Sequence, residues 1–227
     1  MTTLGIVKRN IVRADKAAVA RLSKLGVATI HEAMGRVGLM KPYMRPIYKD
    51  ANICGTAVTI LLQPGDNWML HVAAEQLQPG DVAVAACTTD NADGFFGDLL
   101  ATSFKARGAV GLIIDGGVRD VTDLEKMGFP VVSKAIHSKG CIKATLGSVN
   151  IPIVCAGAQV NPGDVVIADI DGVVVVPAAM AGVVADAAEK RESFEGEKRA
   201  RFAAGELGLD MYNMREPLAK AGLKYID

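Results

Sequence analysis

The stretch Gly94–Asp123, GFFGDLLATSFKARGAVGLIIDGGVRDVTD, decides the fold of this chain. Its apolar-periodic segment from Leu99 to Ala106 predicts a short helix, with Asp98 as the N-cap and Gly108 as the C-cap. The continuous apolar run Val110–Ile114 is typical of a strand that is buried on both faces. The first half of the chain continues this alternation of helix and strand, which indicates an α/β protein.

The lengths of these two elements bring charged side chains together. A helix of about nine residues is roughly 14 Å long, and a strand of five or six residues is roughly 17–20 Å long. Because the strand runs back alongside the helix, we expect Asp98 to lie near Arg119 and Asp120. We also expect Gly116 and Gly117 to let the backbone approach closely at this point.

Helix-start amides, two carboxylates and a guanidinium in one place suit a small anion together with a divalent cation. Each residue also fits a structural role on its own, Asp98 as a helix cap and Arg119 with Asp120 as a surface ion pair. Open α/β sheets bind ligands beyond the carboxyl ends of their strands, where these residues are expected. The combination therefore favours a site.

Composition bounds the class of protein. A length of 227 residues predicts a single domain, and a hydrophobic fraction of 50% with only 5% aromatics predicts a core of small aliphatic side chains. The 25 basic and 25 acidic residues cancel, which argues against a nucleic-acid partner. The four cysteines form no C-x-x-C pair and are interpreted as buried free thiols of a reducing compartment. No signal peptide or membrane-spanning run is evident, so a cytoplasmic location is expected.

The second half of the chain is predicted to be mostly β, with strands that include Ile151–Cys155, Val165–Asp169 and Gly172–Val176. A long final helix is then predicted from Pro177 to about residue 204. Its first part is apolar and is expected to pack on its own domain, whereas the part from Glu189 onward is charged on nearly every face. That outer part is either a solvated arm or an arm laid on a neighbouring subunit, and we favour the second.

The spacing of Asp98 from Arg119 and Asp120, a D-x20-R-D pattern, resembles the signature of the RraA-like family. Within that family the chain most resembles the 4-hydroxy-4-methyl-2-oxoglutarate / 4-carboxy-4-hydroxy-2-oxoadipate aldolases of bacterial aromatic-acid degradation, from about Gly26 to the C-terminal helix. The resemblance implies a layered β/β/α swivelling-domain-like fold over residues 1–227, with a C-terminal helical arm over 177–227. The family also contains regulators of ribonuclease E, which leaves a protein-binding regulator as the alternative function.

The resemblance also implies roles for the converging residues in a class II, metal-dependent aldolase with oxaloacetate decarboxylase activity. Asp120 is implied as the direct ligand of Mg²⁺ or Mn²⁺. Arg119 is expected to donate to the keto oxygen of a 2-oxo diacid, where charge develops. The amides of Leu99 and Leu100 are expected to hold the substrate carboxylate, while Asp98 positions a water for proton transfer at the C4 hydroxyl.

Three further residues complete the expected site. Glu195 matches the C-terminal glutamate that an adjacent subunit supplies in these aldolases, which implies a trimer or hexamer with shared sites. Gly97, in the turn before the helix, is counted among the substrate-binding residues. Lys143 has two interpretations, as a contact of the substrate's distal carboxylate or as a plain surface lysine. His71, like the other two histidines, has no partner at an informative spacing and is assigned a structural role.

Overall fold

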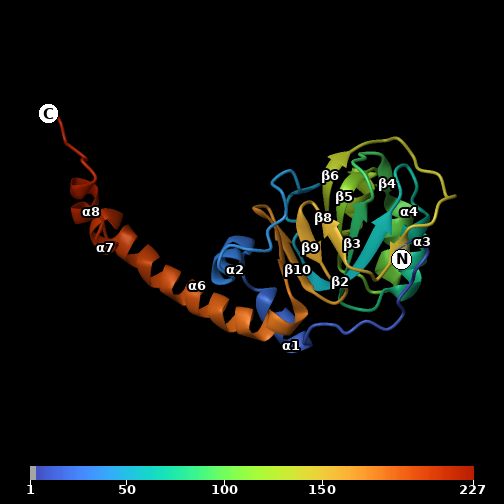
Figure 1. Cartoon of the computed structure of the whole chain (residues 1–227), viewed down its shortest axis with the longest axis horizontal. Coiled ribbons are helices and arrows are strands. Elements are labelled where there is room, and N and C mark those ends of the chain that lie inside the picture. Colours follow the sequence, from blue (N-terminus) through green and yellow to red (C-terminus); the bar gives the residue numbers. More distant parts are fainter. Residues whose placement is uncertain (1–3) are drawn as a thin grey trace. The chain divides into compact units, whose positions relative to one another are not determined.

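The computed structural model describes residues 4–227 of the chain (Figure 1). Contacts between residues divide it into two compact units, the sheet unit Met1–Ala188 and the C-terminal unit Glu189–Asp227. The strands of the sheet unit, in chain order, are β1 (Arg45–Pro46), β2 (Ile53–Leu62), β3 (Asp81–Cys87), β4 (Gly94–Phe96), β5 (Gly111–Val118), β6 (Val131–Ile136), β7 (Ser148–Val149), β8 (Ile153–Cys155), β9 (Ala158–Val160), β10 (Val165–Asp169) and β11 (Gly172–Val176).

Helices follow most of the early strands. They are α1 (Lys16–Leu22), α2 (Val27–Ala33), α3 (Trp68–Gln76), α4 (Asp98–Ala106), α5 (Val121–Lys126), the 3₁₀ turn η1 (Ala178–Met180) and α6 (Ala181–Ala203), followed by α7 (Gly208–Met211) and α8 (Arg215–Lys220). No helix within residues 4–227 combines the length and the hydrophobicity needed to cross a membrane.

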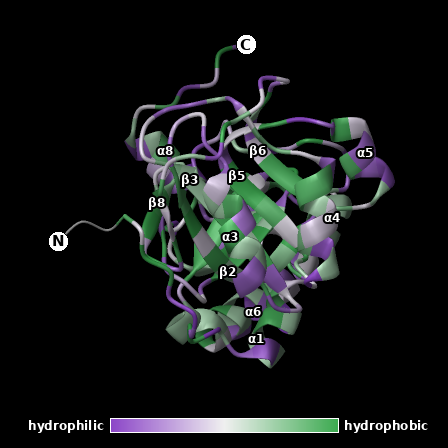
Figure 2. Cartoon of the chain, turned by 90° about the vertical axis from the view of Figure 1, so that its right-hand side faces the viewer, coloured by the Kyte–Doolittle hydropathy of each residue, from purple (hydrophilic) through white to green (hydrophobic). Residues whose placement is uncertain are grey.

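Within the described residues, one large mixed sheet runs in the order β1-β6-β5-β3-β2-β10-β11, with β4 paired to β5 and β7 paired to β2. Strands β2, β3, β5 and β6 are mutually parallel, whereas β1, β7, β10 and β11 join by antiparallel pairing. The parallel strands are rich in hydrophobic residues, as Figure 2 shows for β5 and β6. Their carboxyl ends meet at one edge of the sheet, and this edge carries the candidate site.

The sheet alternates its side chains between two layers. On one face, Val58 and Ile60 of β2 pack in a core with helices α3, α4 and α5. Beside that core, α1, α2 and the start of α6 pack on β10 and β11. On the other face, Ala57 of β2 packs in a second core with the β8–β9 hairpin. A layer of helices, a central sheet and a smaller β layer are the layered α/β fold that the family resemblance implied.

Strand β5 is longer than predicted, because Asp115, Gly116 and Gly117 continue it beyond Ile114. A Cβ atom on Gly117 would lie 2.1 Å from the carbonyl oxygen of Ala92, and one on Gly116 would lie 3.0 Å from the ring of Phe95. The two glycines therefore admit the neighbouring segment that contains β4. The expectation that the backbone approaches closely here is therefore confirmed at Gly117, where the carbonyl of Ala92 comes near.

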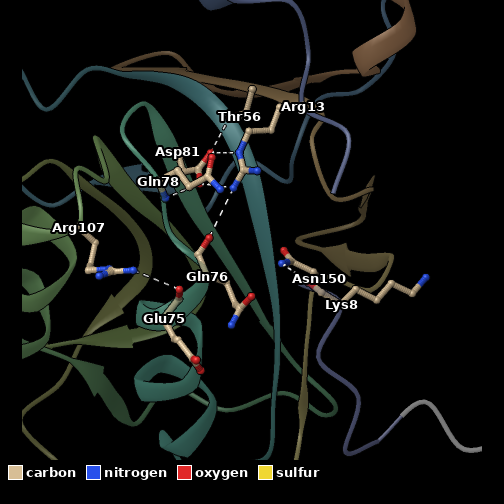
Figure 3. A network of polar contacts seen from close by, with 9 residues as sticks. All are labelled: Lys8, Arg13, Thr56, Glu75, Gln76, Gln78, Asp81, Arg107 and Asn150. Atoms are coloured by element: carbon tan, nitrogen blue, oxygen red, sulfur yellow. Dashed lines mark hydrogen bonds and ion pairs between the residues drawn. The ribbon is translucent and has the colours of Figure 1, made fainter. Parts of the chain in front are cut away.

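The N-terminal segment is tied to the opposite edge of the sheet by a buried ion pair (Figure 3). The carboxylate of Asp81, at the start of β3, is fully buried and accepts two hydrogen bonds from Arg13, at 2.8 and 2.7 Å. It also accepts hydrogen bonds from the hydroxyl of Thr56 at 2.7 Å and from the amide of Gln78 at 2.8 Å. All of its lone pairs are thereby engaged, which is the condition under which a buried charge is tolerated.

All four cysteines are free thiols, as predicted, but only Cys155 is fully buried, and the other three are partly exposed. Burial raises the pKa of Cys54 to about 12 and that of Cys141 to about 11, so these thiols stay protonated at neutral pH.

The first part of the long final helix packs on the sheet unit, as its composition predicted. The buried residues of α6 end at Ala188, where the sheet unit ends. Within the C-terminal unit, Arg201 pairs with Glu206 at 2.6 Å and Arg215 pairs with Asp210. The ring of Phe202 packs beside that of Tyr212, the residue directly after α7, with the ring centroids 6.3 Å apart. Exposed ion pairs of this kind contribute little stability individually.

Candidate active site

A small pocket of about 90 Å³ lies where β4 leads into α4 and where β5 ends. It brings together most of the residues that the sequence singled out, from segments up to 76 positions apart. Its wall consists of Asn67, His71, Phe95, Gly97, Asp98, Leu99, Leu100, Arg119, Asp120 and Lys143. The predicted meeting of Asp98 with Arg119 and Asp120 is therefore present in the structure.

Asp120 sits directly after β5 in a left-handed backbone conformation, with φ at +57°. Its Oδ2 atom accepts a hydrogen bond from the amide of Asp98 at 3.2 Å and lies 3.6 Å from Nε of Arg119. Left-handed conformations are uncommon outside glycine and cost free energy, and they persist where the surroundings enforce them, often at functional sites. The carboxylate is about one-third exposed and therefore open to the pocket.

Asp98 differs from its predicted role as a helix cap. The N-cap of α4 is Gly97, and Asp98 is the first helical residue, with no side-chain capping hydrogen bond. The physical reason is that the carboxylate of Asp120 accepts the Asp98 amide, so the cap comes from a residue 22 positions away. The Asp98 side chain is left available to the pocket that it lines. At the other end of α4, Gly108 follows the C-cap residue with φ at +84°, close to the prediction.

Gly97 is the glycine that makes this arrangement possible. A Cβ atom at this position would lie only 2.1 Å from Oδ2 of Asp120 and 3.2 Å from Cγ of Arg119. A larger side chain at Gly97 would therefore push the Asp120 carboxylate out of its present position. The sequence placed Gly97 among the substrate-binding residues, and its position in the structure shows a steric role beside them.

Helix α4 begins directly at the pocket. Its first backbone hydrogen bond runs from the amide of Ala101 to the carbonyl of Gly97, so the amides of Leu99 and Leu100 have no carbonyl partner within the helix. The Leu99 side chain is 79% exposed, whereas Leu100 is buried and anchors the helix. Both amides therefore lie at an anion-attracting helix start.

Arg119 is held in place through its backbone, while its side chain is partly exposed. Its amide donates to the carbonyl of Phe96 at 2.9 Å, which joins the end of β5 to the end of β4. About half of the side chain is exposed. A Cβ atom on Gly140 would lie 3.2 Å from Nη1 of Arg119, so the chain near Gly140 runs close to the guanidinium.

Lys143 reaches the pocket from a loop that is held by a buried carboxylate. Asp66 is only 2% exposed, and it accepts hydrogen bonds from the amides of Trp68, Ala144 and Thr145 at 2.8, 2.7 and 2.8 Å. Burial alone would raise the pKa of Asp66, but these three amides outweigh burial and lower that pKa. The loop that carries Lys143 is therefore pinned beside the start of α3.

Sequence reasoning missed two pocket residues, one at the N-cap of α3 and one in its first turns. No role was predicted for Asn67, and His71 was assigned a structural one, yet both line the pocket. Burial lowers the pKa of His71, and the nearby ammonium of Lys143 lowers it further, so the imidazole is neutral at pH 7. The i, i+4 spacing of Asn67 and His71, which places both on one side of the helix start, was the available signal.

The side-chain atoms available at this pocket limit which metal ion it could bind. Within residues 4–227 no group of three or more His, Cys, Asp or Glu side chains is arranged as a metal cage. The Oδ1 atom of Asp120 accepts no hydrogen bond from the described residues. One carboxylate oxygen at the pocket is therefore free to bind a metal ion. Mg²⁺ typically uses one or two carboxylates together with water and substrate oxygens. One open carboxylate in a water-accessible pocket suits such an ion, and it does not suit structural zinc.

Glu195 is the predicted residue that this pocket does not contain. It belongs to the C-terminal unit, where its carboxylate pairs with Nε of Arg191 at 2.8 Å, one helical turn away. Both side chains are partly exposed, so this pair is held only weakly.

The fold and the pocket together define an α/β protein of layered architecture, with carboxylates and a guanidinium at the carboxyl edge of its sheet. The chain belongs to the RraA-like family, described as Aldolase/RraA, whose sequence pattern matches residues 27–175.

Two relatives and one solved structure illustrate the similarity. A protein of Halalkalibacterium halodurans named "Putative 4-hydroxy-4-methyl-2-oxoglutarate aldolase" is 27% identical over 183 residues, covering 81% of this chain and 87% of the relative. A protein of Burkholderia multivorans with the same name is 29% identical over 143 residues, covering 63% and 87%. The crystal structure of Streptomyces coelicolor RraAS2, described as an unusual member of the RNase ES inhibitor RraA family, superposes with a TM-score of 0.75 at 28% identity, covering 84% and 99%.

Proposed function

We propose that this protein is a carbon–carbon lyase that cleaves 4-hydroxy-4-methyl-2-oxoglutarate or 4-carboxy-4-hydroxy-2-oxoadipate by a retro-aldol reaction. The products are pyruvate and either a second pyruvate or oxaloacetate. The observation that carries the proposal is the meeting of Arg119, Asp120 and the start of α4 in one pocket. The names of its relatives support the same reaction class.

The chain's own residues account for binding and orientation. The amides of Leu99 and Leu100 receive the carboxylate next to the 2-oxo group, because anions are favoured at a helix start. Arg119 donates to the 2-oxo oxygen, on which negative charge grows as the carbon–carbon bond breaks. Lys143 then faces the distal carboxylate across a pocket whose wall it shares with Arg119.

Asp120 is the residue that would hold a divalent ion, Mg²⁺ or Mn²⁺. A bound ion of this kind supplies Lewis-acid polarisation of the 2-oxo carbonyl. Asp98 holds a water that takes the proton of the C4 hydroxyl. Schiff-base chemistry would instead require a desolvated lysine. Two candidates for it are engaged in ion pairs, Lys134 with Asp90 and Lys139 with Asp93.

Oxaloacetate decarboxylation belongs to the same proposal. Loss of CO₂ from oxaloacetate leaves the pyruvate enolate that retro-aldol cleavage also produces, so the groups that stabilise one intermediate serve both reactions. Glu195 is proposed to act on the site of an adjacent subunit in a trimer or hexamer. The charged outer half of α6 offers no buried face of its own, which is consistent with a role at another subunit.

A regulator that binds a ribonuclease is the second candidate. It is favoured by the similarity to Streptomyces coelicolor RraAS2, whose description names an RNase inhibitor family. The two candidates differ in whether turnover occurs, because a regulator that acts only through its surface needs no substrate chemistry.

Pyruvate release from both 4-hydroxy-2-oxo diacids, measured with and without Mg²⁺ and after chelation, tests the proposal. We expect release that chelator abolishes and Mg²⁺ restores, and we expect Asp120→Ala to be folded and inactive. Full activity in metal-free buffer would exclude the metal-dependent mechanism. No release under any condition would favour the regulator.

A further inference from the structure

Asn67 carries an unexplained acceptor at the pocket. The residue is only 9% exposed, directly precedes α3 and contributes to the pocket wall. Its Nδ2 atom donates to the carbonyl of Phe95 at 2.9 Å, which fixes the orientation of the carboxamide. Its Oδ1 atom is buried and accepts no hydrogen bond from residues 4–227.

A buried acceptor without a donor is costly, and native proteins satisfy nearly all such groups. Asn150 has a second orphan oxygen of this kind, but Asn150 does not line the pocket. Because Asn67 does, the missing donor at Asn67 is expected to be a molecule that enters the pocket. A pocket of about 90 Å³ has room for a water molecule beside a ligand group.

The chemistry of the substrate limits what that donor is. At neutral pH a 4-hydroxy-2-oxo diacid offers carboxylate and keto oxygens, which are acceptors, and its only donor is the C4 hydroxyl. If Asn67 held that hydroxyl proton, it would oppose the cleavage, because this proton has to leave. A water molecule has two protons, so it can donate to Asp98 and to Asn67 and still present a lone pair to the hydroxyl.

We propose that Asn67 is a positioning residue that shares with Asp98 the water that takes the C4 hydroxyl proton. This inference deepens the proposed function and rests on it. As the C3–C4 bond breaks, its electron pair passes into the enolate and the O–H pair forms the new C4 carbonyl. The hydroxyl proton goes to the water, which passes one of its own protons to Asp98.

If the proposal is right, substituting Asn67 should slow only one of the two reactions that the site catalyses. Aldol cleavage needs the hydroxyl proton to leave, whereas oxaloacetate has no such hydroxyl and loses CO₂ without this transfer. A purely structural role, such as holding the Phe95 carbonyl, would affect both reactions alike, because both use the same pocket. The ratio of the two activities therefore separates positioning from structure.

The experiment measures kcat and KM for aldol cleavage and for oxaloacetate decarboxylation in Asn67→Ala and Asn67→Leu. We expect the aldol kcat to fall about tenfold or more, because a positioned proton-transfer group usually accelerates a reaction by at least that factor. The KM for the aldol substrate and the rate of decarboxylation should change by much smaller factors. Asn67→Ser keeps an acceptor oxygen and should recover part of the aldol kcat. Asn150→Ala removes an orphan amide oxygen outside the pocket and should leave the ratio of activities as in wild type.

Equal losses in both activities for Asn67→Ala and Asn67→Leu would overturn the inference and leave the proposed function standing. An identical aldol kcat for Asn67→Ser and Asn67→Ala would overturn it as well. A wild-type protein that turns over neither substrate would defeat the proposed function itself and the inference with it.

Discussion

Replacing Gly97 by alanine should separate the activity of this protein from its stability. The new Cβ atom would lie 2.1 Å from Oδ2 of Asp120, whereas real Cβ contacts essentially never fall below 3.0 Å. The Asp120 carboxylate therefore has to move by about 1 Å. A displacement of that size in an active site costs on the order of 10²-fold in rate, which corresponds to about 2.7 kcal/mol of lost transition-state stabilisation.

The stability of the same variant should change little. Gly97 has φ at −155° and ψ at −165°, an extended conformation that alanine also adopts. Losing the hydrogen bond from the Asp98 amide to Asp120 costs about 1 kcal/mol, and replacing glycine by alanine returns about 0.4–1 kcal/mol by restricting the unfolded chain. These contributions nearly cancel.

The assay combines pyruvate release with thermal unfolding for Gly97→Ala and a matched control, Gly182→Ala. A Cβ atom at Gly182 meets nothing within 4 Å, so this control should keep its activity and be at least as stable as wild type. Gly97→Ala should lose about 10²-fold in kcat/KM with an unfolding temperature near that of wild type. Wild-type turnover in Gly97→Ala would refute the steric argument, and so would an unfolded protein.

Three further predictions concern charged residues. Arg119→Ala should lower turnover of the aldol substrate and of oxaloacetate together, by about 10²–10³-fold, and Arg119→Lys should recover little of it. Loss of only one activity in steady-state assays would mean that the two reactions share no intermediate. Mixing Glu195→Ala with Asp120→Ala after dissociation and reassembly should raise activity above either parent, and mixtures as inactive as the parents would exclude a shared site. Arg13→Ala should lower the free energy of unfolding by about 3 kcal/mol, because it leaves the buried charge of Asp81 with only two of its four hydrogen bonds. Urea titration measures this change, and an unchanged urea midpoint would contradict the prediction.

Local chain geometry explains why part of the site was predictable. Asp98 and Asp120 lie at the two ends of one helix–strand unit, so the lengths of α4 and β5 are enough to bring them together. The predicted cap at Asp98 was wrong, because a tertiary contact from Asp120 took the place of the local side chain. A pattern of helix-capping residues carries no information about such a contact.

The rest of the pocket depends on contacts that the sequence does not announce. Lys143 arrives because Asp66 binds amides 78 and 79 positions further along the chain. Asn67 and His71 enter because α3 lies beside α4, which follows from the strand order β5-β3-β2 and not from the helix itself. Hydrophobic periodicity identifies the buried face of a helix, but it does not identify which neighbour its polar residues meet.

The left-handed backbone of Asp120 restricts how this site can change during evolution. At a positive φ, glycine, asparagine and aspartate are accommodated at lower cost than most other residues. Among these three, aspartate alone carries a charge, and its codons lie one nucleotide from those of asparagine and of glycine. A lineage can therefore lose this carboxylate in a single mutational step while its strands, helices and outer surface stay the same. In a family whose members are named both as aldolases and as RNase ES inhibitors, that geometry offers a short path from a catalyst to a protein that acts only by binding.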